Sequence, residues 1–174
     1  MSDFQVTDRL VLRSFQYEDA AGFYEDVFRH PDLWELFELD ASPKFSQAQS
    51  YVSIRADLSH RARFYDYVIV HKETDRLIGE INAAYVKPDC AELGYAIGPA
   101  FRGNGFASEA VAGLLEGLRN EGIREVYGSC APSNHSSMRV LENNLFTLTK
   151  EIPHRIYQME ERSDLFWFHR SLFE

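Results

Sequence analysis

An amphipathic helix set between two strand-like runs is the feature that most constrains the fold of this chain. Its apolar residues, from Ala107 to Leu118, recur at intervals of three and four residues, the period of a helix with one buried face. Ala91–Ile97 precedes the helix and Glu125–Ala131 follows it, and both runs have the pattern of a strand. Two strands joined by a crossover helix lie parallel in one sheet. The sequence therefore predicts a parallel strand pair bridged by this helix.

Three glycines indicate how this helix packs and where it ends. Gly113 and Gly117 each cost about 1 kcal/mol relative to alanine in a helix interior. Their presence predicts that the helix lies close against a sheet. Gly122 follows the last turn and is expected to end the helix.

The remaining segments predict a mixed α/β arrangement. Further strands are expected at Phe4–Phe15, Phe64–His71, Leu77–Val86, Leu145–Ile152 and Leu165–Leu172. Further helices are expected at Tyr17–Phe28, from Ser46 to Arg61, and at Ser136–Asn144. The three strands from Phe64 to Ile97 are expected to form an antiparallel meander. With 174 residues, the chain is expected to be one domain, 1–174, because one core suffices at about this length.

Two local features accompany these elements. Ser46, with Gln49 three residues later, has the pattern of a capping box and predicts a helix start. The segment His30–Phe45 is punctuated by Pro31 and Pro43 and is expected to be irregular. It is either a flap over a site or a cover for the core.

Charge and cysteine usage exclude several classes of function. The chain has 18 basic and 27 acidic residues, a formal net charge of −9. Non-specific nucleic-acid binding relies on clustered Lys and Arg, so no nucleic-acid partner is expected. The acidic balance either favours a cationic partner or simply keeps the protein soluble.

Cys90 and Cys130 lie far apart and no Cys or His pair has zinc-ligand spacing, so neither a disulfide framework nor a metal site is expected.

The sequence also gives an expectation about location. Its N-terminus lacks the pattern of a signal peptide, and no apolar run approaches the roughly 20 residues that cross a bilayer. A cytoplasmic protein with no membrane association is expected.

The segment "FRGNGFASEA", Phe101 to Ala110, leads into the central helix. A helix start presents unpaired N–H groups and a partial positive charge, which favour an anion such as phosphate. Gly103 and Gly105 remove side chains that would keep a phosphate away, and Arg102 adds a charge. A Walker loop is absent, and Ser108 stands where a dinucleotide fingerprint has Gly or Ala. A pyrophosphate is therefore the expected ligand.

The longer segment "LGYAIGPAFRGNGFASEA" resembles motif A of the Gcn5-related N-acetyltransferases (GNAT), in which a strand splays from its neighbour and meets an R/Q-x-x-G-x-G/A loop. Arg102, Gly105 and Ala107 occupy its three fixed positions. The opening "TDRLVLRSF", the order of elements and "NHSSMRVLENNLF" extend the resemblance over nearly the whole chain. It is most similar to the branch that acetylates ribosomal-protein N-termini. The resemblance implies a mostly antiparallel sheet with a splayed parallel pair, flanked by helices.

The resemblance also implies the ligand and the site residues. Acetyl-coenzyme A is the implied donor, and the acceptor is a primary amine of a protein N-terminus or a small molecule. Tyr95 and Ile97 are expected to pair with the pantetheine arm, and a backbone N–H near Ile97 is the implied oxyanion donor. Asn134 is expected to contact the arm and Ser137 to protonate the leaving thiolate. The pyrophosphate is expected on the backbone of Arg102, Gly103, Asn104, Gly105, Phe106 and Ala107.

Other positions depart from the family pattern or leave alternatives open. Many relatives carry a tyrosine four residues after the serine, but this chain has Leu141 there. The usual L-G-F ending of the second motif is replaced by 144–146, "NLF". Glu92, Glu80 and His154 are alternative general bases, the last because an unperturbed His pKa of about 6.5 suits that role.

Two questions of function and assembly stay open at this stage. A non-catalytic acyl-CoA binding or sensing module is the alternative to an enzyme, and Ser137 favours the enzyme. The sequence is compatible with a monomer or a two-fold homodimer.

Overall fold

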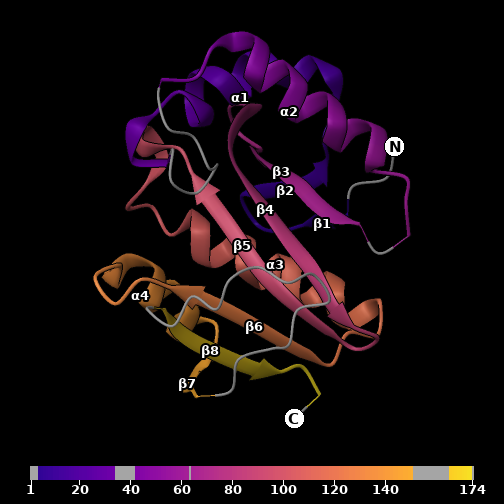
Figure 1. Ribbon diagram of the computed structural model, residues 1–174, viewed down its shortest axis with the longest axis vertical. Helices are drawn as coiled ribbons and strands as arrows, with labels where there is room; N and C mark the ends of the chain where they lie inside the picture. Colours follow the sequence, from indigo (N-terminus) through magenta and orange to yellow (C-terminus); the bar gives the residue numbers. More distant parts are fainter. Residues whose placement is uncertain (1–3, 34–41, 63, 151–164, 174) are drawn as a thin grey trace.

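The computed structural model describes residues 4–33, 42–62, 64–150 and 165–173. Within these residues, eight strands form one sheet in the order β1-β2-β3-β4-β5-β6-β8-β7 (Figure 1). The strands are β1 Gln5–Val6, β2 Leu10–Ser14, β3 Tyr65–His71, β4 Arg76–Lys87, β5 Cys90–Ile97, β6 Glu125–Cys130, β7 Thr147–Thr149 and β8 Phe166–Ser171. The helices are α1 Ala20–Phe23, α2 Phe45–Leu58, α3 Phe106–Asn120 and α4 His135–Asn143. Shorter 3₁₀ or π turns are η1 Tyr17–Asp19, η2 Tyr24–Phe28, η3 Pro31–Leu33 and η4 Pro99–Phe101.

Neighbouring strands of the described sheet are antiparallel except β5 and β6, which are parallel. The mixed α/β class and the predicted parallel pair are therefore confirmed. Parallel pairing runs only from Cys90 opposite Glu125 to Leu93 opposite Gly128. Beyond that point β5 continues along β4 to Ile97 while β6 continues along β8, so the two strands part (Figure 1).

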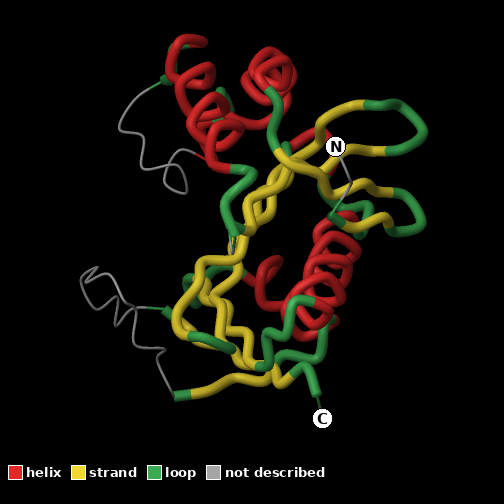
Figure 2. The backbone as a smooth tube through the Cα atoms, turned by 90° about the vertical axis from the view of Figure 1, so that its right-hand side faces the viewer, coloured by secondary structure: helices red, strands yellow, loops and turns green. Residues whose placement is uncertain are grey.

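Two apolar clusters lie on opposite faces of the sheet. Val68 and Ile69 are adjacent in β3, so their side chains point to opposite faces. Ile69 belongs to the larger cluster, which includes residues of α3 and α4, and Val68 to a smaller one with residues of α1 and α2. Figure 2 shows α3 alongside the sheet, with α1 and α2 at one end of the molecule. Because β5 leads through η4 into α3, the start of this helix lies next to the parting of β5 and β6.

Helix α3 packs against the sheet through its glycines, as predicted. A Cβ at Gly113 would lie 2.8 Å from Cγ2 of Thr7, and one at Gly117 would overlap the ring of Phe4. Both neighbours belong to the N-terminal hairpin region, so α3 holds β1 and β2 in place. Gly122, with φ +84°, follows the helix end.

One expected strand is divided in two. The segment Phe4–Phe15 contains β1 and β2 because the chain turns at Thr7. The Thr7 hydroxyl accepts a hydrogen bond from the Leu10 amide at 3.0 Å, and the Thr7 amide donates to the Leu10 carbonyl at 3.0 Å. A side-chain bond to nearby backbone favours such turns and interrupts the alternation of a single strand.

The start of α2 also differs from the prediction. Lys44 is the N-cap, and its amide donates to Oε1 of Gln47 at 2.8 Å. Gln47 stands three residues after the N-cap, so it closes the cap where Gln49 was expected, and the helix begins one residue before Ser46. Of the expected irregular segment His30–Phe45, residues 34–41 lie outside the described residues.

Three further observations bear on function. No helix among the described residues is long and apolar enough to cross a membrane. In the same part of the chain, no group of three His, Cys, Asp or Glu residues is placed to hold a metal ion. Cys90 and Cys130 are both free and buried.

The turn from α4 to β7 holds a leucine in a left-handed conformation. Leu145 has φ +61° and is 73% exposed. The preceding Asn144 is buried, and its side-chain amide donates to the carbonyls of Ser108 at 3.1 Å and Val140 at 2.9 Å. These bonds tie the turn to the first turn of α3. An L-residue costs roughly 1 to 2 kcal/mol in this conformation, so the tie outweighs local strain.

Leu145→Gly should therefore raise the free energy of unfolding by about 0.5 to 1 kcal/mol, because glycine relieves the strain and the exposed leucine adds little packing. Urea unfolding measures the change. Leu148→Gly is the matched control, since Leu148 is also exposed but lies in the extended strand β7, where glycine should destabilise. Equal losses of stability in both variants would contradict the strain at Leu145.

Candidate active site

The loop between β5 and α3 has the glycine geometry that an anion site needs. Gly103 has φ +77° and Gly105 has φ +79°, values that side chains rarely allow. A Cβ at Gly103 would meet no heavy atom within 4 Å, so the outer side of the loop is open. Gly105 is the N-cap of α3, and no side chain caps the helix there.

Consecutive backbone amides of this loop and of the helix start are unpaired. The amides of five consecutive residues donate to no group among the described residues: Gly103, Asn104, Gly105, Phe106 and Ala107. The sixth predicted amide, that of Arg102, already donates to the Pro99 carbonyl at 3.4 Å. The loop thus offers an array of donors at the positive end of the α3 dipole, which suits a phosphate group.

The Arg102 side chain, expected to supply positive charge, is engaged at the end of β5. Its Nε donates to the Ile97 carbonyl at 3.0 Å. Its Nη1 forms an ion pair with Asp32, which lies in η3. Arg102 therefore links the loop to the segment before α2.

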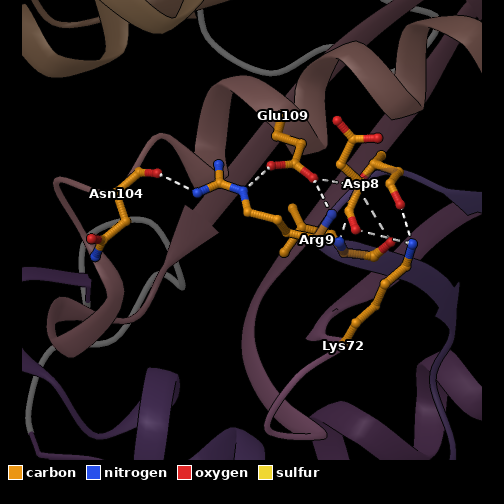
Figure 3. Close-up of polar contacts among 7 residues, drawn as sticks. Asp8, Arg9, Lys72, Asn104 and Glu109 are labelled. Carbon is orange, nitrogen blue, oxygen red and sulfur yellow. Dashed lines mark hydrogen bonds and ion pairs between the residues drawn. The ribbon is translucent and has the colours of Figure 1, made fainter.

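A second arginine, to which sequence reasoning gave no role, holds the loop from the β1–β2 turn. Nη1 of Arg9 donates to the Asn104 carbonyl at 3.0 Å, and Nε donates to Glu109 at 2.7 Å (Figure 3). Its guanidinium carbon lies 4.6 Å from the centroid of the Phe106 ring. In the sequence, Arg9 is marked as notable only by its place in "TDRLVLRSF", one of the stretches that resemble the family pattern.

Glu109, in the first turn of α3, is the other half of this contact. Its Oε1 accepts hydrogen bonds from the Thr7 hydroxyl at 2.6 Å and from the Arg9 amide at 2.7 Å. Burial disfavours the charged form, but these hydrogen bonds and the Arg9 charge outweigh it and lower the pKa of Glu109. The carboxylate thus anchors the N-terminal hairpin to the helix start.

Tyr95 and Ser137 meet across the parting of β5 and β6. The phenol of Tyr95, from β5, donates to the hydroxyl of Ser137, in α4, with an O···O distance of 3.2 Å. Burial raises the pKa of Tyr95 to about 12, although the bond to Ser137 opposes this. The phenol is therefore protonated at neutral pH. Sequence reasoning used only the backbone of Tyr95 and missed this side-chain contact, because only the fold brings α4 opposite β5.

Asn134 and Ser137 are also joined to each other. Asn134 is the N-cap of α4, and its Oδ1 accepts from the Ser137 amide at 3.0 Å. Asn134 thereby fixes the helix turn that carries the Ser137 hydroxyl.

The carboxylate candidates lie on the opposite face from Tyr95. Tyr95 and Leu93 pack with the cluster against α3 and α4, whereas Glu92, adjacent to Leu93, points to the other face. Glu92 is 7% exposed, and its partner in the register of β6 is Tyr127, one residue before pairing ends. His154 lies outside the described residues.

Glu80 lies on the same face as Glu92 but beneath α2. It is 3% exposed, and the Tyr51 hydroxyl lies 2.8 Å and 3.0 Å from its two carboxylate oxygens. An ion pair between Arg55 and Asp66, 2.9 Å long, lies in the same cluster. Burial and the Asp66 charge raise the pKa of Glu80 to about 8, and burial raises that of Asp66 to about 6. These residues form a largely buried polar cluster that is partly protonated at neutral pH.

This arrangement predicts a pH-dependent stability. The folded-state pKa of Glu80, about 8, exceeds the ordinary value of 4.5, so the folded protein retains a proton that the unfolded chain releases between these pH values. The free energy of unfolding should fall as the pH rises from about 5 to 8, by up to about 1.4 kcal/mol per pH unit, and Asp66 acts in the same direction.

Urea unfolding at pH 5.5 and pH 8 should show a smaller pH effect for Glu80→Gln than for the unchanged protein. Glu116→Gln, which alters an exposed glutamate of α3, is the control and should keep the full effect. An identical pH slope in Glu80→Gln would contradict the raised pKa.

Comparisons with known proteins agree with this geometry. A family model described as "Acetyltransferase (GNAT) domain" matches residues 9–147. An uncharacterized N-acetyltransferase of Bacillus licheniformis, p20, is 29% identical over 143 residues, which cover 80% of each chain. The crystal structure of a GNAT-family acetyltransferase from Bacillus anthracis superposes with a TM-score of 0.79 at 20% identity, covering 98% of this chain and 99% of that one. RimL, a ribosomal L7/L12 alpha-N-protein acetyltransferase solved with coenzyme A, gives 0.77 at 20% identity and 98% coverage of both chains. At these identities, the two structural similarities establish the fold alone.

Proposed function

The chain belongs to the acetyltransferase (GNAT) family, and on that premise we propose that it transfers an acetyl group from acetyl-coenzyme A to a primary amine. The observation that carries the proposal is the row of unpaired amides from Gly103 to Ala107, next to the parting of β5 and β6. The amides are suited to the coenzyme diphosphate. The β5 edge from Gly94 to Ile97, which has no β6 partner in the described sheet, is suited to the amides of the pantetheine arm.

The proposed chemistry divides between the two faces of the sheet. Attack of a neutral amine on the thioester carbonyl forms a C–N bond and breaks the C–S bond, so the amine loses a proton and the sulfur gains one. Ser137 gives its proton to the sulfur and regains one from the Tyr95 phenol, to which it is hydrogen-bonded. Tyr95 is then reprotonated from solvent, and the base releases the amine proton to solvent, so that one proton is lost and one is gained. A backbone N–H near Ile97 stabilises the oxyanion.

Glu92 is the proposed base, acting directly or through water, from the face opposite Tyr95. Glu80 is a less suitable base because it is buried beneath α2 and both of its oxygens lie within hydrogen-bond distance of the Tyr51 hydroxyl. Bond formation on one face and thiolate protonation on the other fit a thioester seated between the parted strands.

The acceptor is proposed to be the α-amino group of a protein. The structural similarity to RimL supports this class, and the net charge of −9 suits a cationic or amine-bearing partner. A non-catalytic acyl-CoA sensor is the alternative. The contact between Tyr95 and Ser137 favours turnover, because coenzyme binding alone does not require a proton donor there.

The protein is mixed with acetyl-CoA and with panels of N-terminal peptides, polyamines and aminoglycosides, and a thiol reagent measures the free coenzyme A. Free thiol should appear only with a suitable acceptor. Mass spectrometry then locates the added acetyl group. Coenzyme binding without acceptor-dependent release would support the sensor, and no coenzyme binding would remove both functions.

Ser137→Ala and Tyr95→Phe should each lower kcat by about tenfold or more, because each removes a hydroxyl from the proton path. The affinity for acetyl-CoA, measured by calorimetry, should stay within about twofold. Ser136→Ala is the matched control, because Ser136 is exposed one residue away on α4. A kcat unchanged from that control would exclude the hydroxyl concerned as a proton donor.

A further inference from the structure

We propose that Arg9 contacts the coenzyme diphosphate and supplies the positive charge at the start of α3 that the sequence motif assigns to Arg102. The inference rests on the proposed function, because it concerns the same ligand. Three observations support it: the contacts that fix the Arg9 guanidinium, the short distance from this group to Gly105, and the partners that the neighbouring cations bind.

Three contacts fix the guanidinium of Arg9. Nε donates to Oε2 of Glu109 at 2.7 Å and Nη1 donates to the Asn104 carbonyl at 3.0 Å. The Phe106 ring lies against the group, 4.6 Å from its central carbon. Figure 3 shows the side chain held between Asn104 and Glu109. A guanidinium fixed in this way loses little further freedom when it binds a ligand.

The remaining nitrogen, Nη2, faces the helix start. It has no hydrogen-bond partner among the described residues. It lies 3.5 Å from the position that a Cβ would take on Gly105, the N-cap of α3. The unpaired amides of Gly105, Phe106 and Ala107 begin at the same point. A phosphate oxygen held by these amides would therefore lie within reach of a charged donor.

The other nearby cations are already bound. Arg102 pairs with Asp32 and donates to the Ile97 carbonyl. The ammonium of Lys72 donates to the backbone carbonyls of Thr7 and Asp8, on the far side of the hairpin turn from Asn104 (Figure 3). Nη2 of Arg102 also has no hydrogen-bond partner among the described residues, but it is Nη2 of Arg9 that lies within 4 Å of the Cβ position on Gly105.

Glu109 affects both the charge and the orientation of the Arg9 guanidinium. A carboxylate in the first turn of α3 would repel a diphosphate, but its ion pair with Arg9 offsets that charge. The same ion pair orients the guanidinium so that Nη2 points to the loop. Arg9 is therefore both a positioning residue for Asn104 and a direct ligand contact.

Calorimetry with coenzyme A, and with pantetheine as a probe that lacks the diphosphate, tests the assignment. Arg9→Gln should weaken coenzyme A binding by about tenfold or more, the usual effect of losing a charged hydrogen bond, and should leave pantetheine binding within about twofold. Arg102→Gln should lose less than Arg9→Gln. Arg119→Gln is the matched control, since it removes the same charge from the last turn of α3.

Salt dependence separates a direct contact from loop positioning alone. A direct ion pair with phosphate is screened, so the affinity of the unchanged protein should fall with salt more steeply than that of Arg9→Gln. Arg9→Lys keeps the charge but lacks the several donors of the guanidinium, and its affinity for coenzyme A should keep the steeper dependence on salt. The midpoints of urea unfolding establish that each variant is folded.

Three results would overturn the inference. An Arg9→Gln affinity equal to that of Arg119→Gln would exclude any role, and a weakened affinity with an unchanged salt slope would reduce Arg9 to a positioning residue. Absence of coenzyme A binding by the unchanged protein would instead overturn the proposed function itself, and the inference with it.

Discussion

Loss of pairing between β5 and β6 after Leu93 and Gly128 is the constraint from which the site follows. A parallel pair needs a crossover, and here that crossover is α3, which begins where the strands have separated. The same separation leaves one edge of β5 without a strand partner in the described sheet and sets α4 opposite it, so that Ser137 reaches Tyr95. One interruption of regular hydrogen bonding thus creates both a place for an extended amide chain and a contact between two hydroxyls.

The rest of the molecule keeps this opening in place. Apolar residues on both sheet faces hold α1 and α2 on one side and α3 and α4 on the other. Close packing at Gly113 and Gly117 fixes α3 against the N-terminal hairpin. That hairpin in turn carries Arg9 to the loop, so packing along the helix determines the electrostatics at its start. The packing of the core therefore determines where the residues of the site lie.

Local sequence patterns predicted those features that depend on nearby residues. The period of α3, its stop at Gly122 and the parallel pair follow from spacing and crossover rules, and the positive φ values of Gly103 and Gly105 fit the anion loop. The turn at Thr7 was missed because a side-chain hydrogen bond interrupts an otherwise regular alternation.

Contacts between distant segments could not be predicted in the same way. Tyr95 and Ser137 are 42 residues apart, and Arg9 and Asn104 are 95 apart, so neither pair has a signal at helix or strand spacing. Burial of Glu80 depends on the docking of α2, and the engagement of Arg102 by Asp32 depends on the path of η3. Motif matching identified the loop, but the charges around it are set by tertiary structure.

The bridge from Arg9 to Asn104 also has a consequence for biosynthesis. A ribosome releases the arginine early and the loop only after some ninety-five further residues have been made, the separation of the two groups in the chain. A nascent fragment that lacks the loop cannot form the contact between Arg9 and Asn104, whatever structure its first strands have reached. The site that we propose for the coenzyme diphosphate is therefore complete only in chains whose two segments have already come together.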